Sequence, residues 1–447
     1  MARAKKEAAL TPEDRLQAAL VPDWERPYKL PENWCWTTVG AINQYVGISV
    51  DPTKAKNKTF ELYSVPSSAD NYPEIVLGAD IGSTKQSVKK GDVLLCKINP
   101  RINRVWKVSK YTDHSLLASS EWIVIRNSGL ISNYLMWCFR SPYFRGYMLS
   151  NVSGVGGSLM RAQPKFVQGY PVPVPPLAEQ QRIVDHIESL FAKLDEAKEK
   201  AQAVVDSFET RKAAILHKAF TGELTAKWRE EHGVSIDNWK TTRFDSVAAI
   251  RSNLVDPAEY QSFPHIAPDN IEKKTGVLLE YHTIAEDGVT SGKHRFYSGQ
   301  ILYSKIRPYL SKAVVVDFDG LCSADMYPIE AYQNARCLWY YMLSDEFLLQ
   351  ASTAGSRSVL PKINQKELSA LTVHLPTNDR EQEEIARILD ELFDKEQQTK
   401  EAAEIVLDQI DLMKKSILAR AFRGELGTND PSEESAVELL KEIIRRG

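Results

Sequence analysis

The sequence predicts an α+β fold in which two mixed α/β blocks are separated by two long antiparallel helices that form a coiled coil, with a pseudo-two-fold internal repeat. Three observations predict this fold. The 447-residue chain repeats itself at an offset of 202 residues, both copies contain heptad patterns, and short apolar runs typical of strands occur at matching places in the two halves. A repeat of this length indicates a duplicated structural unit.

The repeat is clearest in two pairs of segments. EQQRIVDHIESLF at 179–191 matches EQEEIARILDELF at 381–393, and RKAAILHKAFTGEL at 211–224 matches MKKSILARAFRGEL at 413–426. A third pair, GDVLLCKINPRI at 91–102 and GQILYSKIRPYL at 299–310, is similar at an offset of 208. The chain is therefore predicted to be a tandem of block, long helix, block, long helix.

Apolar residues spaced alternately by four and three predict both long helices, because this spacing forms the seam of a coiled coil. The predicted helix-pairing residues are Ile183, Ile187, Leu190, Leu194, Val204 and Phe208 in the first helix and Ile385, Leu389, Leu392, Val406 and Ile410 in the second. The start and stop signals are Pro175 and Pro176, then Asn378 and Asp379, and the terminating Gly222 and Gly424.

We prefer antiparallel pairing of the two helices within one chain, because each helix follows its own block and a parallel pairing would crowd the blocks together. A helix of ~46 residues is ~70 Å long and extends beyond a block of this size. Two alternatives stay open at this point: ordinary core helices of two independent domains, and coiled-coil dimerisation between two chains.

The two blocks are predicted to mix short strands and helices. Strands are expected at 92–96, 120–126, 300–304 and 313–317, and helices at 133–149 and 336–350. At the N-terminus, Thr11, Pro12 and Asp14 form a capping box that begins a short helix to about residue 20. Asp430 and Pro431 are predicted to begin a C-terminal helix in the same way.

Composition excludes several classes of protein. Charged residues make up 26% and hydrophobic residues 43% of the chain, which is ordinary for a folded water-soluble protein and excludes wholesale disorder and collagen. The chain shows no run of ~18 apolar residues and no signal peptide, so we expect a cytoplasmic protein without membrane contact. Its five cysteines lack CxxC spacing, which favours reduced core thiols over disulfides or a zinc site.

The net charge of −3 is unevenly distributed along the chain. Residues 31–176 carry sixteen basic and nine acidic side chains, a net of +7, whereas 237–376 carry −2 and 377–447 carry −7. A basic block inside an acidic chain is the pattern expected when one region binds a polyanion. The negative second block does not fit a uniformly basic binding face.

Common catalytic motifs are missing from the sequence. The chain contains no phosphate-binding GxxxxGK[ST] motif, no HExxH motif and no GxSxG motif. The glycine-rich segment at 154–158 has neither the preceding strand nor the following helix of a dinucleotide site. We therefore expect a protein without catalytic residues and without a cofactor or metal of its own.

Basic side chains interleaved with Asn and aromatic residues follow a predicted strand in each block. Lys and Arg neutralise phosphates, while Arg and Asn have the geometry to bind base edges in the major groove. The candidate DNA-binding residues are Lys97, Asn99, Arg101, Asn103, Arg104 and Lys107 in the first block and Lys293, Arg295, Lys305, Arg307 and Lys312 in the second. Two small loops, at 153–161 and 353–358, add Ser158, Arg161, Ser356 and Arg357 as candidates whose backbone could approach phosphate.

The chain resembles the specificity subunits of type I restriction-modification systems. The resemblance depends on PPLAEQQRI at 175–183 and KAFTGEL at 218–224, with second copies EQEEI at 381–385 and RAFRGEL at 420–426. It implies that two target recognition domains read the two halves of a bipartite, asymmetric DNA site. The implied organisation is an N-terminal segment with a short helix at 1–30, recognition domains at 31–176 and 237–376, a central helix and linker at 177–236, a distal helix at 377–428 and a C-terminal helix at 429–447.

The same resemblance implies partners. The helices would set the nonspecific spacer of the DNA site and dock two modification subunits, which methylate adenine at N6 and bind S-adenosylmethionine, and restriction subunits with motor and endonuclease activity would join the complex. Two other functions stay open: a coiled-coil scaffold without DNA specificity, and a self-contained restriction-modification enzyme.

Overall fold

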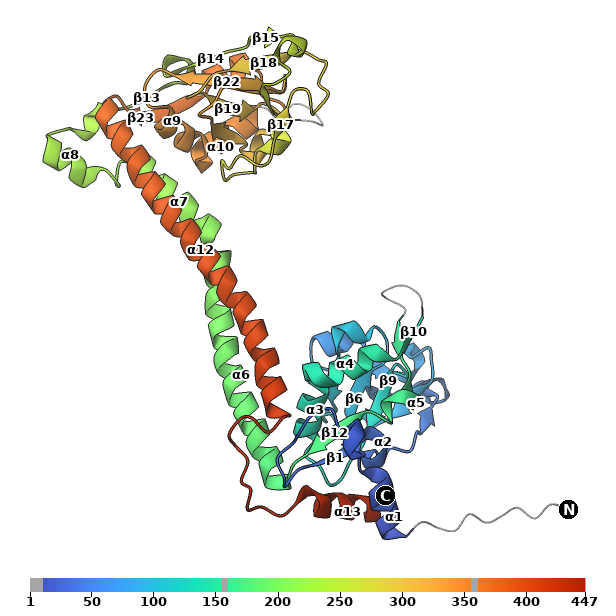
Figure 1. Cartoon of the computed structure of the whole chain (residues 1–447). Coiled ribbons are helices and arrows are strands. Elements are labelled where there is room, and N and C mark those ends of the chain that lie inside the picture. The colour runs from blue at the N-terminus through green and yellow to red at the C-terminus, as the bar shows by residue number, and fades with distance from the viewer. Residues whose placement is uncertain (1–10, 155–159, 355–360, 447) are drawn as a thin grey trace. The chain divides into compact units, whose positions relative to one another are not determined.

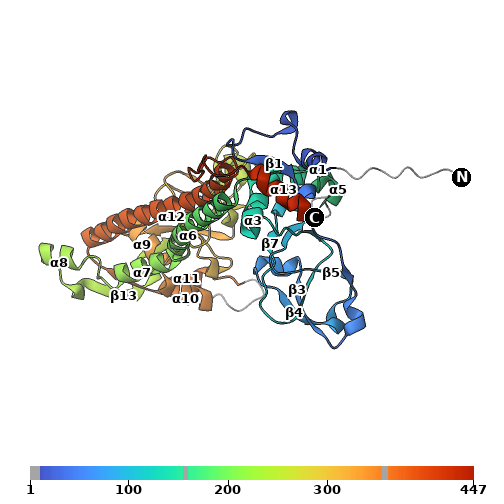
Figure 2. The same cartoon turned by 90° about the horizontal axis from the view of Figure 1, so that it is seen from below.

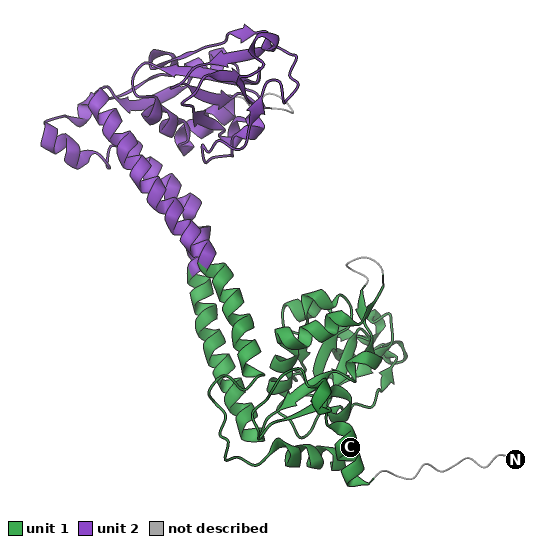
Figure 3. Ribbon diagram, viewed as in Figure 1, with its two compact units in different colours: residues 1–200, 406–447 green, residues 201–405 purple. Residues whose placement is uncertain are grey.

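The computed structural model describes residues 11–154, 160–354 and 361–446. Two compact units make up the chain, one formed by Met1–Lys200 with Val406–Gly447 and the other by Ala201–Ile405 (Figure 3). Each unit combines a mixed α/β domain with segments of the long helices. The α+β class predicted from the sequence is confirmed.

The strands of the first unit form two sheets and two two-stranded ribbons. Its strands are β1 (Cys35–Thr38), β2 (Ser49–Val50), β3 (Thr59–Tyr63), β4 (Glu74–Leu77), β5 (Lys85–Ser87), β6 (Val93–Cys96), β7 (Val105–Lys107), β8 (Ser115–Ala118), β9 (Trp122–Ile125), β10 (Val152–Ser153), β11 (Arg161–Ala162) and β12 (Pro171–Val174). One sheet has the order β2-β5-β8-β3-β4, with β3 and β8 parallel, and a second has the order β7-β6-β9. The pairs β1-β12 and β10-β11 form antiparallel ribbons.

Strand β6 is buried on both of its faces, which explains its nearly continuous run of apolar residues. Val93 and Leu95 belong to the core that packs on the helices of the first unit. Leu94 and Cys96 point the opposite way, into a second cluster with Trp106 and other aromatic side chains. The small sheet therefore lies between two apolar layers and holds the end of β6 rigidly.

The helices of the first unit pack against one face of this small sheet (Figures 1 and 2). They are α1 (Pro12–Ala19), α2 (Val39–Ile42), α3 (Ser132–Arg140), α4 (Pro142–Ser150), α5 (Pro164–Val167), the first part of α6 (Leu177–Asp206), the last part of α12 (Asp379–Ala421) and α13 (Ala436–Arg446). The predicted capping box at Thr11 is confirmed. The start predicted for the C-terminal helix is wrong: Asp430 caps a turn at Ser432, and α13 begins at Ala436.

The second unit repeats the sheet organisation of the first, except that its small sheet has four strands and its described residues form no counterpart of the β10-β11 ribbon. Its strands are β13 (Trp239–Arg243), β14 (Ala248–Ile250), β15 (Leu254–Val255), β16 (Pro264–Ile266), β17 (His282–Thr283), β18 (Lys293–Phe296), β19 (Ile301–Ser304), β20 (Ala313–Val315), β21 (Gly320–Cys322), β22 (Met326–Ala331) and β23 (Thr372–Pro376). The orders are β15-β18-β21-β16-β17, with β16 and β21 parallel, then β14-β22-β19-β20, and β13-β23. Strand β19 corresponds to β6 and is buried in the same way, between two apolar clusters.

The helices of the second unit are α7 (Phe208–Phe220), α8 (Ala226–His232), α9 (Ala335–Met342), α10 (Asp345–Ala354) and α11 (Gln365–Ala370), together with the end of α6 and the first part of α12. The helices predicted at 133–149 and 336–350 are each divided in two. Ser141 and Ser344 divide them, because each serine hydroxyl accepts a hydrogen bond from the backbone N–H three residues later and caps a new helix.

The first long helix is interrupted, unlike the single helix that the sequence predicts. It consists of α6 and α7, separated at Ser207, whereas α12 is continuous over 43 residues. The hydroxyl of Ser207 donates to the carbonyl of Ala203 at 2.6 Å, and the Arg211 guanidinium bonds both Ser207 and the carbonyl of Val204. Side chains that bond to helix carbonyls in this way bend helices.

Ion pairs show that the long helices pair antiparallel within each unit. In the first unit, Lys198 of α6 lies 3.2 Å from Asp411 of α12, and Asp195 pairs with Lys414. In the second unit, Arg211 of α7 lies 2.7 Å from Glu396 of α12, and the charged Nζ of Lys400 lies 4.9 Å from the ring centre of Phe208. Residue numbers rise along one helix as they fall along the other.

The predicted seam is only partly the observed contact face. Ile183, Ile187, Phe208, Ile385, Leu389 and Ile410 are buried, and Leu190, Leu194, Val204 and Leu392 are half-buried. Val406, however, is 41% exposed, and its neighbour Leu407 is half-buried in its place. A straight helix drifts by ~20° per heptad relative to a 3.5-residue repeat, so the contact face moves to neighbouring positions towards the end of α12.

Candidate DNA-recognition surface

A short turn with the same backbone conformation follows the central strand of the small sheet in each unit. The first proline turn (99–103) follows β6, and the second proline turn (307–311) follows β19. Each begins and ends with a non-glycine residue at positive φ: 47° and 53° at Asn99 and Asn103, and 49° and 46° at Arg307 and Ser311. Residues other than glycine rarely adopt this conformation, so its duplication marks a constrained site in both units.

The surrounding chain holds both proline turns in the same way. The N–H of Asn99 donates to the carbonyl of Met160 at 2.8 Å, and the N–H of Arg307 donates to that of Pro361 at 2.7 Å. Pro100 and Pro308, at the second position of each turn, are buried. Each turn is therefore fixed at its base while its tip lies at the surface.

The exposed side chains of the turns are one arginine and one large apolar or aromatic residue per unit. Arg101 and Arg307 are exposed, and within the described residues neither guanidinium makes a hydrogen bond or an ion pair. Beside them, Ile102 is 54% and Tyr309 is 47% exposed. A free guanidinium can bind guanine bidentately, and an adjacent apolar or aromatic group can contact a base or sugar.

Several predicted residues of the first unit instead bind other parts of the domain. Asn103 donates from Nδ2 to the carbonyl of Arg140 at 3.1 Å, Lys107 bonds Asn133 on α3, and Arg161 lies 3.3 Å from Glu121. The Arg104 guanidinium contacts the Cys96 sulfur at 4.0 Å. Lys97 and Asn99 are half-buried beside the turn, and the buried Oδ1 of Asn99 has no hydrogen-bond partner among the described residues.

The predicted lysines of the second unit are also tied to backbone carbonyls. Lys293 is buried and bonds the carbonyl of Ser291 at 3.0 Å, and Lys312 bonds that of Pro268 at 2.6 Å. Lys305 bonds the carbonyl of Ala324. Their charges still contribute to the local potential, but their ammonium groups are positioned by the fold and do not extend into solvent.

Arg295 lies among aromatic rings, with its guanidinium carbon 4.8 Å from the ring centre of Tyr297 and 5.4 Å from that of Tyr260. Such stacking holds a guanidinium flat against the surface. Of the predicted loop residues, Ser158, Ser356 and Arg357 lie outside the described residues, so the structure leaves those predictions as they stand.

A second duplicated contact was missed by the sequence reasoning. Lys85 on β5 bonds the carbonyl and hydroxyl of Ser83, at 3.0 and 2.6 Å, as Lys293 on β18 does with Ser291. Burial lowers the pKa of both lysines. The signal was available, because this Ser-x-Lys pair repeats at the same offset of 208 as the proline turns.

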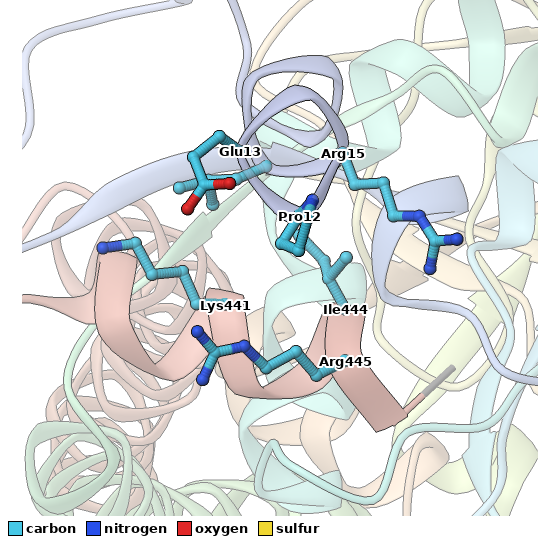
Figure 4. Close-up of a pocket in the computed structure, with 7 residues that line it drawn as sticks. Pro12, Glu13, Arg15, Lys441, Ile444 and Arg445 are labelled. Atoms are coloured by element: carbon cyan, nitrogen blue, oxygen red, sulfur yellow. The ribbon is translucent and has the colours of Figure 1, made fainter. Parts of the chain in front are cut away.

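A small pocket of about 170 Å³ lies between α1 and α13. Figure 4 shows residues that line it, among them Pro12, Glu13, Arg15, Lys441, Ile444 and Arg445. The volume of this pocket is below the ~300–1,000 Å³ that is usual for ligand pockets. In the described part of the chain, no group of three or more His, Cys, Asp or Glu residues is arranged to hold a metal ion. No helix in those segments is both long enough and apolar enough to cross a bilayer.

Comparison with known proteins identifies the family. The family described as "Type I restriction modification DNA specificity domain" matches residues 236–406. The EcoDI specificity subunit of Escherichia coli is 36% identical over 370 residues, which cover 76% of this chain and 82% of that protein. The EcoKI specificity subunit of Escherichia coli strain K12 is 23% identical and covers 93% and 96%, respectively.

Two solved structures share the fold at 20% identity, each covering 90% of this chain and 100% of the other. The first, described as "Structural basis underlying complex assembly and conformational transition of the type I R-M system", has a TM-score of 0.70. The second, the HsdS subunit from Thermoanaerobacter tengcongensis, has a TM-score of 0.63. The matched family and the 36% identical relative identify a DNA-specificity protein. The chain belongs to the family of type I restriction enzyme specificity subunits.

Proposed function

We propose that each α/β domain reads one half of a bipartite DNA site, with the first and second proline turns as reading elements. The observation that supports this assignment most directly is the duplication of the turn, with one unpaired, exposed arginine in each copy. A rigid turn places a guanidinium at a fixed position relative to a groove, as bidentate recognition of a base requires. Because the two copies differ in sequence, the two half-sites differ as well.

Membership in the family supports a proposal for the partner proteins. We infer that the paired helices hold the two reading domains at a set separation and dock two modification subunits. Restriction subunits then join this complex. This chain supplies recognition, while the modification subunits bind S-adenosylmethionine and flip the target adenine into their own pockets. The complex acts on cytoplasmic double-stranded DNA. Half-sites about one helical turn (~10 bp) apart would present themselves on one face of the duplex.

Bivalent binding strengthens recognition by two linked domains. Once one domain has bound its half-site, the second domain finds its own half-site at a high effective concentration. Salt strongly weakens such binding, since each phosphate contact releases counterions.

Single substitutions in each turn test this function. We expect Arg101→Ala to relax base preference in one half-site and Arg307→Ala to relax it in the other, each by ~1–3 kcal/mol. The measurement is sequencing of methylated adenines in cells that express each variant with the modification subunit. Lys54→Ala, on an exposed residue of the first domain outside its turn, should leave the recognised sequence unchanged. Equal loss at both halves from either arginine variant would contradict the two-reader assignment.

A further inference from the structure

Lys212 on α7 has a buried ammonium group that contacts the second α/β domain. The residue is 8% exposed, and its Nζ donates to the carbonyls of Lys274 at 2.9 Å and Thr275 at 3.3 Å. The same Nζ lies 5.4 Å from the ring centre of Phe393 on α12. Two carbonyl oxygens and an aromatic face thus surround a cation that water hardly reaches.

Both carbonyls belong to the tip of a short hairpin, residues 271–279, which we call the bracing hairpin. Ile271 and Leu278 pair across it as an isolated bridge. At its tip, Gly276 has a φ of 76°, and a Cβ there would lie 2.2 Å from the Trp339 ring of α9. The bracing hairpin therefore packs against Trp339 of α9 through Gly276, and its carbonyl groups accept hydrogen bonds from Lys212.

The bracing hairpin also holds the second proline turn. The N–H of Lys274 lies 3.1 Å from the carbonyl oxygen of Leu310 and 3.2 Å from that of Ser311, the last two residues of the turn. Lys274 has a φ of 63°, so its own backbone is constrained as well. One residue thus bonds Lys212 through its carbonyl and the proline turn through its N–H.

The first unit provides an internal comparison. At the repeat offset of 202, Lys414 corresponds to Lys212 and Phe191 to Phe393, and Lys414 Nζ lies 5.1 Å from the Phe191 ring centre. Lys414, however, pairs with the carboxylate of Asp195, and its side chain is 22% exposed. At the position of Asp195, the second half of the chain has Gln397. Lys212 therefore lacks this carboxylate and binds the carbonyls of the hairpin.

We propose that Lys212 is a positioning residue for DNA recognition. It fixes the second proline turn, through the bracing hairpin, to the helices α7 and α12, and thereby sets the orientation in which Arg307 and Tyr309 meet the bases. This inference rests on the proposed function of the turn, and it applies to the second domain only.

Three variants of the full-length chain test the proposal. Lys212→Met removes the ammonium but fills the same space, which favours folding. Gln397→Asp keeps the ammonium and restores the carboxylate found in the first unit, so that it competes with the hairpin carbonyls. Lys414→Met is the matched control, since it removes the equivalent lysine from the unit in which Asp195 binds it.

Each variant is expressed with the modification subunit, and methylated adenines are sequenced to give the base preference at each half-site. We expect Lys212→Met and Gln397→Asp to reduce discrimination in the half read by the second domain by about tenfold, close to the cost of one misread base pair. The other half should keep its preference, and Lys414→Met should leave the second half unchanged. An unchanged second half in both test variants, or an equal effect of the control, overturns the proposal.

Hydrogen exchange of the free chain gives a second readout that needs no DNA. We expect the Lys274 amide to exchange faster in Lys212→Met and Gln397→Asp than in the wild-type chain or the Lys414→Met control, because its bonds to the turn loosen. Unchanged protection of the Lys274 amide in both test variants contradicts the proposal that Lys212 holds the second proline turn through the bracing hairpin. If the wild-type chain yields no bipartite methylation pattern, the proposed function fails, but the amide measurement still decides whether Lys212 holds the turn.

Discussion

Glu381 is a fully buried carboxylate with partners from three parts of the second unit. Its Oε1 accepts hydrogen bonds from Thr225 Oγ1 at 2.8 Å, Arg229 Nη1 at 2.7 Å and Trp239 Nε1 at 3.0 Å. In the first unit, Glu179 accepts from Thr428 Oγ1 at 2.6 Å. One acidic residue near the start of each long helix thus fixes that helix to the chain that follows the other helix.

We predict that Glu381→Ala destabilises the second unit by ~3–5 kcal/mol, because it leaves the Arg229 guanidinium buried without its carboxylate. Urea unfolding followed by tryptophan fluorescence measures the change, with Trp239 as a reporter inside the network. Glu383→Ala, on an exposed residue of the same helical turn, should shift stability by less than ~0.5 kcal/mol. A similar loss in both variants would mean that the helix itself, and not the buried network, was damaged.

Residue types predicted the basic clusters that contain the proline turns, but not the turns themselves or the contacts of most lysines. Arg101 and Arg307 each lie a few residues after the end of a strand, β6 or β19, so a local pattern sufficed to find them. Lys107, Lys305 and Lys312 bind acceptors 19 to 44 residues away in sequence. A long flexible side chain reaches whichever acceptor the tertiary fold provides, and no spacing rule encodes that choice.

At the scale of elements, α13 shows how a terminal helix completes a distant domain. Leu440 and Ile443 are buried in the core of the first unit, and a Cβ on Gly129 would lie 2.4 Å from the Ile443 side chain. The N–H of Ala436 donates to the carbonyl of Asn33 at 2.8 Å. The last helix is therefore part of the core that begins near the N-terminus.

We predict that Leu440→Ala lowers the stability of the first unit by ~2–5 kcal/mol, the usual effect of deleting a fully buried leucine. Thermal unfolding of the full-length chain measures it, and only the transition of the first unit should move. Glu442→Ala, on the exposed face of the same helix, is the control and should cost no more than ~0.5 kcal/mol. A shift of both transitions would indicate that α13 stabilises more than the first unit.

Sequence patterns predicted the long helices well because their signals are local. The predicted start signals at Pro176 and Asn378 and the stop signals at Gly222 and Gly424 lie within three residues of the observed helix ends. The interruption at Ser207 could not be predicted, since it depends on Arg211 bonding backward along the helix. The start of α13 was missed because Asp430 satisfies a turn before the helix begins.

At the scale of the whole molecule, the two units share their architecture but not their net charge. Each unit has its own α/β domain, its own proline turn and its own antiparallel pair of helical segments. The net charge of +7 in residues 31–176 is typical of a DNA-binding domain. The net charge of −2 in residues 237–376 is not. Under the proposed function, recognition by the second domain depends on where a few exposed groups such as Arg307 lie, and less on the total charge.

The length of the paired helices is expected to set the spacer of the DNA site. We expect the insertion of four residues, about one turn, into the paired stretch of both α6 and α12 to lengthen the tolerated DNA spacer. Four residues add ~6 Å of helix, close to two base pairs at ~3.4 Å each. Sequencing of methylated adenines gives the spacer directly. The same insertion in α6 alone should abolish methylation, because it shifts Lys198 and Asp411 out of register. An unchanged spacer in the double insertion would show that the helices do not set the distance between the half-sites.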